Sequence, residues 1–217
     1  MKKTIEEIAQ SLIGRNLSKE DGIDNYLVEK AENRLGIKFP AALKNFYTSV
    51  GNMEIFTSSF ECFVHPDELE MSGDKLIFLE ENQGVCFWAI SAGNNDEMVY
   101  MCTDIEEDEP EWYPEVSMEE FLKVVMYLQC AQGGFEYGSA VYESNFADRK
   151  EYEQYLEETT QDWDKVVEHN GFVAFQKDDK LIWYFYDKDG KIDDILYAST
   201  RTEERQKELD EYGFQEL

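Results

Sequence analysis

The apolar residues in the first quarter of the chain recur at helical spacing. Ile23, Leu27, Ala31 and Leu35 are four residues apart, so they share one face of a predicted helix. Gly36 follows directly and is typical of the residue that ends a helix. The pattern therefore predicts an amphipathic helix that begins near residue 23 and ends at residue 35.

The stretch FPAALKNFYTSVGN predicts a second helix after a tight turn. Pro40 suits a first helical position, and Gly51 suits the end of the helix. The apolar stripe of this helix consists of Leu43, Phe46, Tyr47 and Val50.

Short aromatic and β-branched runs then replace the helical pattern and predict strands. The first four runs are EIFTSSFECFV (54–64), DKLIFLEEN (74–82), GVCFWAIS (84–91) and EMVYMCTD (97–104). Three more occupy the last third: GFVAFQ (171–176), KLIWYFY (180–186) and DDILYAS (193–199). The turn signals KDD and DKDG separate these last strands and predict hairpins.

Further helices are predicted between and after the strands. In VSMEEFLKVVMYLQCAQGG, Ser117 and Glu120 fit a capping box, and Gly133 fits a helix end. The stripe of this helix consists of Phe121, Val125 and Leu128. Helices are also predicted over 147–158 and 202–213, and a short helical or irregular segment over 162–171.

Runs of strands with helices at the edges predict an α+β fold with a mainly antiparallel central sheet. The two N-terminal helices and a middle helix belong to this fold, and a strand-helix elaboration follows at the C-terminal end. Because we find no repeat, low-complexity tract or linker, we expect a single domain, with its core in residues 20–134 and its elaboration in residues 135–217.

The charge of the chain excludes one class of function. The 48 acidic residues outnumber the 20 basic ones and give a net charge of −28. Such a field repels nucleic acids and anionic lipids and attracts cationic proteins. We therefore expect a cationic protein partner and no binding to nucleic acid or membrane.

Other features of the sequence predict a cytoplasmic protein. Glu6 and Glu7 interrupt the apolar stretch that a signal peptide would need, and the longest apolar runs are six residues, far below the ~20 of a membrane helix. The cysteines are widely spaced without a CxxC pair, which predicts reduced and mostly buried thiols. They are Cys62, Cys86, Cys102 and Cys130.

Patterns that would indicate catalysis or a cofactor are missing from the sequence. The segment DKDGKIDD (187–194) has its glycine at position 4 rather than 6 of a calcium loop, so it fits a hairpin turn better. His65 and His169 lie far apart, away from any cysteine pair, and the chain has no GxSxG, Walker or GxGxxG motif. We expect no catalytic, cofactor-binding or metal-binding residue, although a small enzyme using carboxylates remains an alternative.

One charge pattern stands out from the rest of the chain. Residues 76–122 contain 13 acids and no Lys or Arg, and the segment 103–115 (TDIEEDEPEWYPE) alone contains seven acids. Aromatic residues of the kind enriched at interfaces lie among them. The pattern fits either a solvated acidic loop or a docking surface for a cationic partner. The candidate partner-binding residues are Trp88, Tyr100, Glu106, Glu107, Asp108, Glu109, Glu111, Trp112 and Tyr113.

The first two predicted helices resemble a family signature. AENRLGIKFPAALKNFYTSVGN is similar to the opening of the SUKH superfamily, which includes fungal cell-wall glucan-synthesis regulators and many bacterial immunity proteins. The matching positions are Leu35, Gly36, Phe39, Pro40, Leu43, Phe46, Tyr47 and Gly51. Two positions depart from the signature, since Phe39 stands where Leu is usual and Gly51-Asn52 reverses Asn-Gly. The segments LEENQGVCFWAIS, DEMVYMCTD and ILYASTRTEERQKELDEYGF continue the resemblance.

The resemblance implies a non-enzymatic binding module. Bacterial members of the superfamily are commonly antidotes that bind and neutralise a cognate polymorphic toxin, often a nuclease. A nuclease carries a basic surface for phosphates, so an acidic inhibitor would match it in charge. The alternative is a regulatory scaffold like the fungal relatives, which would bind a cellular partner.

Overall fold

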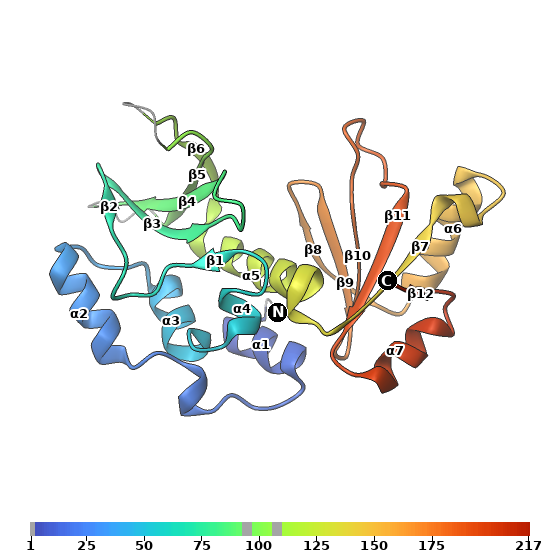
Figure 1. Ribbon diagram of the computed structural model, residues 1–217, viewed down its shortest axis with the longest axis horizontal. Coiled ribbons are helices and arrows are strands. Elements are labelled where there is room, and N and C mark those ends of the chain that lie inside the picture. Colours follow the sequence, from blue (N-terminus) through green and yellow to red (C-terminus); the bar gives the residue numbers. More distant parts are fainter. Residues whose placement is uncertain (1–2, 93–96, 106–109) are drawn as a thin grey trace. The chain divides into compact units, whose positions relative to one another are not determined.

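The computed structural model describes residues 3–92, 97–105 and 110–217. The chain forms two compact units, which Figure 1 shows in sequence colours. Unit 1 consists of Met1–Gln10 and Asn16–Gln129, and unit 2 consists of Ser11–Arg15 and Cys130–Leu217. The division at residue 129 lies near the predicted end of the core at residue 134.

The α+β class with antiparallel strands is confirmed, but the described strands form two sheets rather than one central sheet. Sheet A has the order β1-β3-β4-β5-β6, with β2 paired to β3, and sheet B has the order β12-β7-β11-β10-β9-β8. All of these pairings are antiparallel. Sheet A lies in unit 1, and sheet B lies in unit 2.

Within the first 129 residues, a group of helices is followed by a group of strands and then by one more helix, and the helix α1 and the strands β2 and β6 were not predicted from the sequence. The helices are α1 (Ile5–Ile13), α2 (Asn25–Leu35), α3 (Ala41–Val50), α4 (Glu54–Thr57) and α5 (Met118–Gln129), with a 3-10 turn over Lys19–Asp21. The strands are β1 (Cys62–Phe63), β2 (Met71–Ser72), β3 (Lys75–Glu80), β4 (Phe87–Ser91), β5 (Met98–Cys102) and β6 (Tyr113–Ser117).

The helices α2 and α3 form as predicted, with a left-handed Gly36 (φ 70°) after α2. The whole predicted stripe of α3 is buried, whereas Leu27 and Leu35 of the α2 stripe are half-buried. A buried charge fixes the turn between the helices, because the carboxylate of Glu32 accepts hydrogen bonds from the Phe39 N–H (3.0 Å) and from Lys38 Nζ (2.8 Å). Burial alone would raise the pKa of Glu32, but these bonds hold it below its usual value.

A chain of aromatic rings closes one face of sheet A. Phe46 of α3 stacks on Phe63 of β1 with ring centroids 4.4 Å apart, and Phe63 lies 6.2 Å from Phe78 of β3. Phe78 then meets Phe121 of α5 edge-on at 5.8 Å. The helices α3 and α5 therefore cover the same face, which we call the inner face of sheet A. Figure 1 shows the helices of unit 1 gathered on this side.

The prediction of a strand over 54–64 is wrong for the first residues of this segment. Residues 54–57 form the helix α4, and only Cys62–Phe63 is a strand. Hydroxyl groups stabilise the helical turn, since Thr57 Oγ1 donates to the Met53 carbonyl and Ser59 Oγ to the Ile55 carbonyl. Phe56 of this turn is buried, so packing overrides the β-branched and aromatic composition.

Unit 2 contains the strands of sheet B and two helices. The strands are β7 (Tyr137–Tyr142), β8 (Asp164–His169), β9 (Phe172–Lys177), β10 (Lys180–Phe185), β11 (Ile195–Thr200) and β12 (Gln215–Glu216). The helices are α6 (Arg149–Thr160) and α7 (Glu203–Asp210), with a π turn over Cys130–Gly134 and a 3-10 turn over Glu143–Asn145. The prediction of a helical or irregular segment over 162–171 is wrong, because β8 pairs with β9 there.

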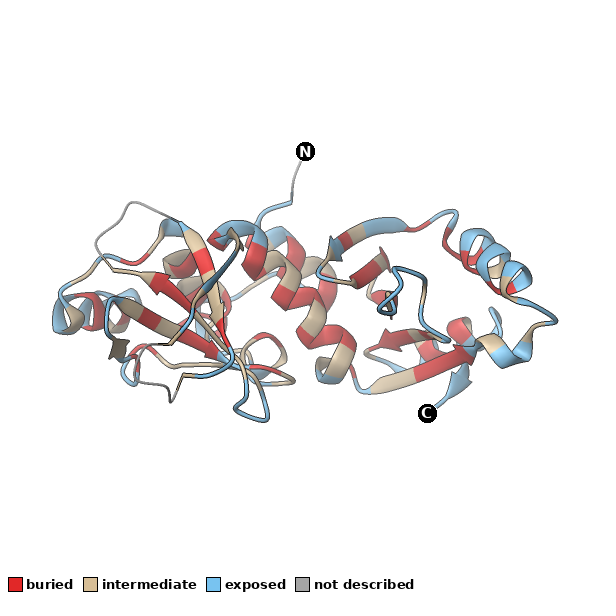
Figure 2. Cartoon of the chain, turned by 90° about the horizontal axis from the view of Figure 1, so that it is seen from above, coloured by how far each residue is buried: buried red, intermediate tan, exposed pale blue. Residues whose placement is uncertain are grey.

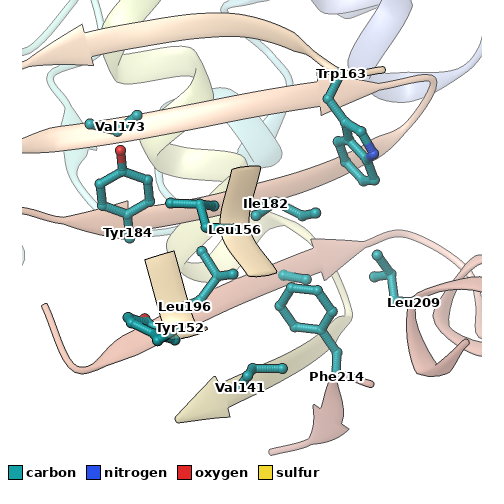
Figure 3. Packing of buried hydrophobic residues seen from close by; sticks show 11 residues of the cluster. Val141, Tyr152, Leu156, Trp163, Val173, Ile182, Tyr184, Leu196, Leu209 and Phe214 are labelled. Atoms are coloured by element: carbon teal, nitrogen blue, oxygen red, sulfur yellow. The ribbon is translucent and has the colours of Figure 1, made fainter. Parts of the chain in front are cut away.

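One face of sheet B packs against α6 and α7 (Figure 3). Tyr152 and Leu156 of α6 and Leu209 of α7 meet strand residues such as Ile182 and Leu196, all of them buried. The two predicted hairpins are confirmed, since β9 and β10 are joined by only two residues and Gly190 adopts φ 75° in the turn after β10. The DKDG segment is thus a turn of a hairpin.

The buried residues lie mainly in the strands and on one side of the helices (Figure 2). The prediction of mostly buried thiols holds for Cys102 and Cys130 only, since Cys86 is half-buried and Cys62 is exposed. Cys62 is exposed because it lies on β1, a two-residue strand at the edge of sheet A. All four thiols are free in the structure as described.

Candidate partner-binding surface

The structure places Trp88 and Tyr100 on opposite faces of sheet A. The Trp88 ring lies 5.9 Å from that of Phe121 on α5, so Trp88 belongs to the inner face. Residues opposite each other in paired strands share a face, and neighbours along a strand alternate. Because Tyr100 pairs with Ala89, the neighbour of Trp88, it lies on the other face. The predicted set of aromatic residues is therefore divided between two surfaces.

We call the face that carries Tyr100 the outer face of sheet A. A row of side chains crosses it from β3 to β6, because Ile77 pairs with Ala89, Ala89 with Tyr100, and Tyr100 with Pro114. Ile77 and Tyr100 are half-buried, and Ala89 is buried. A parallel row contains Glu80, Phe87 and Cys102. The outer face is thus mainly apolar although α3 and α5 lie on the other side.

One cation lies on the outer face. The Lys75 ammonium stands 4.9 Å from the centroid of the Tyr100 ring, in the geometry of a cation–π interaction. The same ammonium donates to Ser91 Oγ (2.9 Å) and pairs with Asp74 (3.0 Å). Three partners therefore hold this lysine in place, and its charge is offset by Asp74.

Acidic side chains lie at the ends of the strands that carry the outer face. Asp74 precedes β3 and Glu80 ends it, and Glu97 precedes β5 and Asp104 follows it. All four are exposed. Because residues 76–122 contain no Lys or Arg, strands β4, β5 and β6 contribute no basic side chain. The field above the outer face is consequently negative.

The segment 103–115 is described only in part. Glu106, Glu107, Asp108 and Glu109 of the predicted set lie outside the described residues. Glu111 is exposed, and Trp112 is half-buried.

Tyr113 begins β6, a strand that the sequence did not predict. The Tyr113 side chain is 48% exposed, and its hydroxyl donates a hydrogen bond to the Glu111 carboxylate, which raises the pKa of Tyr113. Tyr113 is thus the exposed one of the described aromatic residues in the set, while Trp88, Tyr100 and Trp112 are half-buried.

A buried carboxylate that the sequence did not single out lies beside sheet A. Glu61, only 5% exposed, accepts a hydrogen bond from the Asn82 N–H (2.9 Å) in the turn between β3 and β4. Burial raises the pKa of Glu61 to about 7, and the nearby charge of Glu81 acts in the same direction while the Asn82 bond opposes them. No sequence signal marks this residue, because it is one of 48 acidic residues and its burial depends on contacts with distant parts of the chain.

The thiol of Cys86, next to β4, also has a shifted pKa. Burial raises the pKa of the Cys86 thiol to about 11, and the carboxylates of Glu61 and Glu115 add to this effect. A thiol with such a pKa stays protonated at neutral pH and is a poor nucleophile. Cys86 therefore fits a structural residue better than a catalytic one.

Glu61→Gln tests the buried carboxylate. The folded-state pKa lies above the ordinary value of 4.5, so the folded protein is most favoured below about pH 4.5 and loses stability as the pH rises through about 7. We expect the variant to be more stable than the wild type by on the order of 2 kcal/mol at about pH 8 and equally stable at about pH 4.5. Urea unfolding at the two pH values measures this difference. An effect of equal size at both would contradict the assignment.

Among residues 3–92, 97–105 and 110–217, no three His, Cys, Asp or Glu side chains are grouped so that they could hold a metal ion. His65 accepts a hydrogen bond at Nδ1 from the Asp67 N–H (3.3 Å) in a turn. Within the same part of the chain, every helix is too short or too polar to cross a bilayer.

No protein-family model, curated protein or solved structure matches this chain.

Proposed function

We propose that this chain is a non-enzymatic binding module of the SUKH kind, an immunity protein that neutralises a cationic toxin by direct contact in the cytoplasm. The outer face of sheet A carries the proposal, because it combines an apolar centre with acidic strand ends in a stretch of 47 residues (76–122) without a base. The resemblance of residues 23–52 to the opening SUKH signature supports the same class of function.

Physical reasons favour a cationic protein as the partner. A net charge of −28 repels nucleic acid, and it accelerates the encounter with a basic protein. An inhibitor of a nuclease gains from such a field, since the phosphate-binding surface of the enzyme is basic. Strand-end carboxylates act mainly on the association rate, whereas buried apolar contacts act on dissociation.

The experiment is a growth test in bacteria with the toxin encoded by the neighbouring gene. We expect cells that express the toxin alone to stop growing, and cells that also express this chain to grow. The two proteins should then purify together as a complex. Toxicity that persists with this chain present would contradict the proposal, and a neighbouring product that is harmless would favour the scaffold alternative.

Charge reversal adds a kinetic prediction. Glu80→Lys/Asp104→Lys should slow association about tenfold and weaken its salt dependence, with little change in the dissociation rate. Stopped-flow binding at low and high salt measures both rates. The matched control is Glu153→Lys/Glu157→Lys on α6, whose two carboxylates are exposed in unit 2. Equal effects of the two double variants would show that only total charge matters.

A further inference from the structure

We infer that the partner docks flat on the outer face of sheet A and presents apolar side chains surrounded by Lys and Arg. This inference rests on the proposed function, since it locates the surface through which a cationic protein would be bound. The docking centre is the row from Ile77 through Ala89 to Tyr100, and its rim is formed by the exposed acids at the strand ends.

The first argument is that the two faces of sheet A differ in what already covers them. The inner face is closed by the aromatic contacts that join α3 and α5 to β1, β3 and β4. On the outer face, Ile77, Phe87 and Tyr100 remain half-buried, while the smaller side chains of Ala89 and Cys102 between them are buried. An apolar surface of this kind, rimmed by polar residues, is typical of an interaction site.

The second argument is the chemistry of the rim. Asp74, Glu80, Glu97 and Asp104 are exposed around the face, and the one ammonium described on it, that of Lys75, is paired with Asp74. A neutral or acidic partner would leave these carboxylates uncompensated as they lost water. A basic partner pairs with them, so charge complementarity selects the occupant.

The third argument comes from the Tyr100 ring. Its contact with the Lys75 ammonium shows that a cation is accommodated on this surface. Lys75 now occupies the position over the Tyr100 ring and beside Asp74 that a Lys or Arg of the partner could take. Lys75→Met should therefore strengthen partner binding severalfold, because it frees Asp74 and the Tyr100 ring for a cation of the partner and leaves an apolar side chain on the face. A solvated surface without a docking role would show no such gain.

The direct test uses peptides of defined charge and the whole protein. A short peptide that alternates Lys with Leu and Val is titrated into isotope-labelled protein, and amide shifts are followed by NMR. We expect the largest shifts at Ile77, Ala89 and Tyr100. One control peptide keeps the Lys residues and replaces Leu and Val with Ser, and another replaces Lys with Glu. Both controls should bind at least about tenfold more weakly, a difference expected for loss of a central contact.

Several outcomes would overturn the inference. The largest shifts could lie on α6 or α7, the Ser-containing peptide could bind as well as the first one, or the first peptide could fail to bind. Each result would show that this face is no docking surface for basic protein segments.

Protein variants repeat the test with a second measurement. Ile77→Lys places a positive charge in the apolar row and should weaken binding of the first peptide about tenfold or more. Tyr100→Ser, which introduces no charge, should weaken it in the same direction. The matched control is Ala41→Lys, because Ala41 is exposed at the start of α3. Circular dichroism shows whether each variant folds, and unchanged binding in folded Ile77→Lys and Tyr100→Ser would contradict the inference.

The two proposals fail in different ways. If the wild type rescues cells from the toxin and folded Ile77→Lys rescues them equally well, the proposed function stands and the docking face is wrong. If peptides bind at Ile77 and Tyr100 but the toxin is not neutralised, the docking face stands and the proposed function is wrong.

Discussion

Phe46→Ala is expected to lower the free energy of unfolding by about 3–5 kcal/mol. Phe46 is fully buried, stacks on Phe63 at 4.4 Å and meets Tyr47 edge-on at 6.1 Å. Alanine would leave a cavity between α3 and sheet A, where the ring now connects the helix to β1. Urea unfolding of the purified variant, monitored by circular dichroism, measures the loss.

Phe87→Ala on the outer face of sheet A is the matched control for this change. The Phe87 side chain is half-buried, so its removal takes less apolar area from the folded state and should cost about 1 kcal/mol. The pair therefore compares the same substitution in a helix packed on the inner face and in a strand residue on the outer face. Equal losses would mean that the outer face is as closely packed as the inner one, which would contradict the docking surface as well.

Gln129→Leu is expected to have the second large effect. Gln129 is fully buried at the end of α5, and its Oε1 accepts from the backbone N–H groups of Phe60 (2.6 Å) and Glu61 (3.0 Å). Its Nε2 donates to the Glu61 carbonyl (2.6 Å). Leucine fills a similar volume but leaves three backbone groups without these partners.

The expected loss of stability for Gln129→Leu is about 3–4 kcal/mol, since each buried unpaired group costs about 1–3 kcal/mol and part of this cost is relieved by local movement. The matched control is Gln154→Leu on α6, an exposed position where a change within about 0.5 kcal/mol is expected. Thermal unfolding of both variants measures the two losses of stability. A small effect at Gln129 would show that water or a neighbouring group replaces the lost bonds.

The spacing of apolar residues correctly predicted those elements whose apolar side chains all face the same core. The stripe Leu43, Phe46, Tyr47 and Val50 of α3 is buried as expected, because one face of a 3.6-residue helix meets the sheet. In α5 the predicted apolar stripe fits less well. Its member Leu128 is half-buried, while the polar Gln129 beside it is buried. Gln129 is buried because it forms hydrogen bonds with a segment about 68 residues earlier, and a local sequence pattern cannot predict such a contact.

Five described strands were missed, of which β2 and β12 have only two residues each, and the three longer ones were missed for related reasons. The strand β6 contains Pro114 and Glu115, β7 contains Gly138, and β8 is largely polar, so none has the composition of a typical strand. Each forms through pairing with another strand: β6 with the preceding β5, β7 with the distant β11, and β8 with the following β9. Tertiary pairing thus overrides local propensity at these positions.

The candidate site was partly predictable. The base-free stretch is visible in the sequence and supplies the strands of the outer face. The sequence could not assign Trp88 and Tyr100 to faces, because this depends on the register of β4 against β5 and on the position of α5. The buried Glu61 was equally hidden, since its environment comes from the turn at Asn82 and the end of α5.

The most direct test of the account is the dissociation constant of the complex with the neighbouring gene's toxin, measured for the wild type, Ile77→Lys and Ala41→Lys. We predict tight binding by the wild type and by Ala41→Lys that weakens as salt rises, and binding at least about tenfold weaker for Ile77→Lys. Absence of binding by the wild type, or equal affinity of all three proteins, would contradict the account.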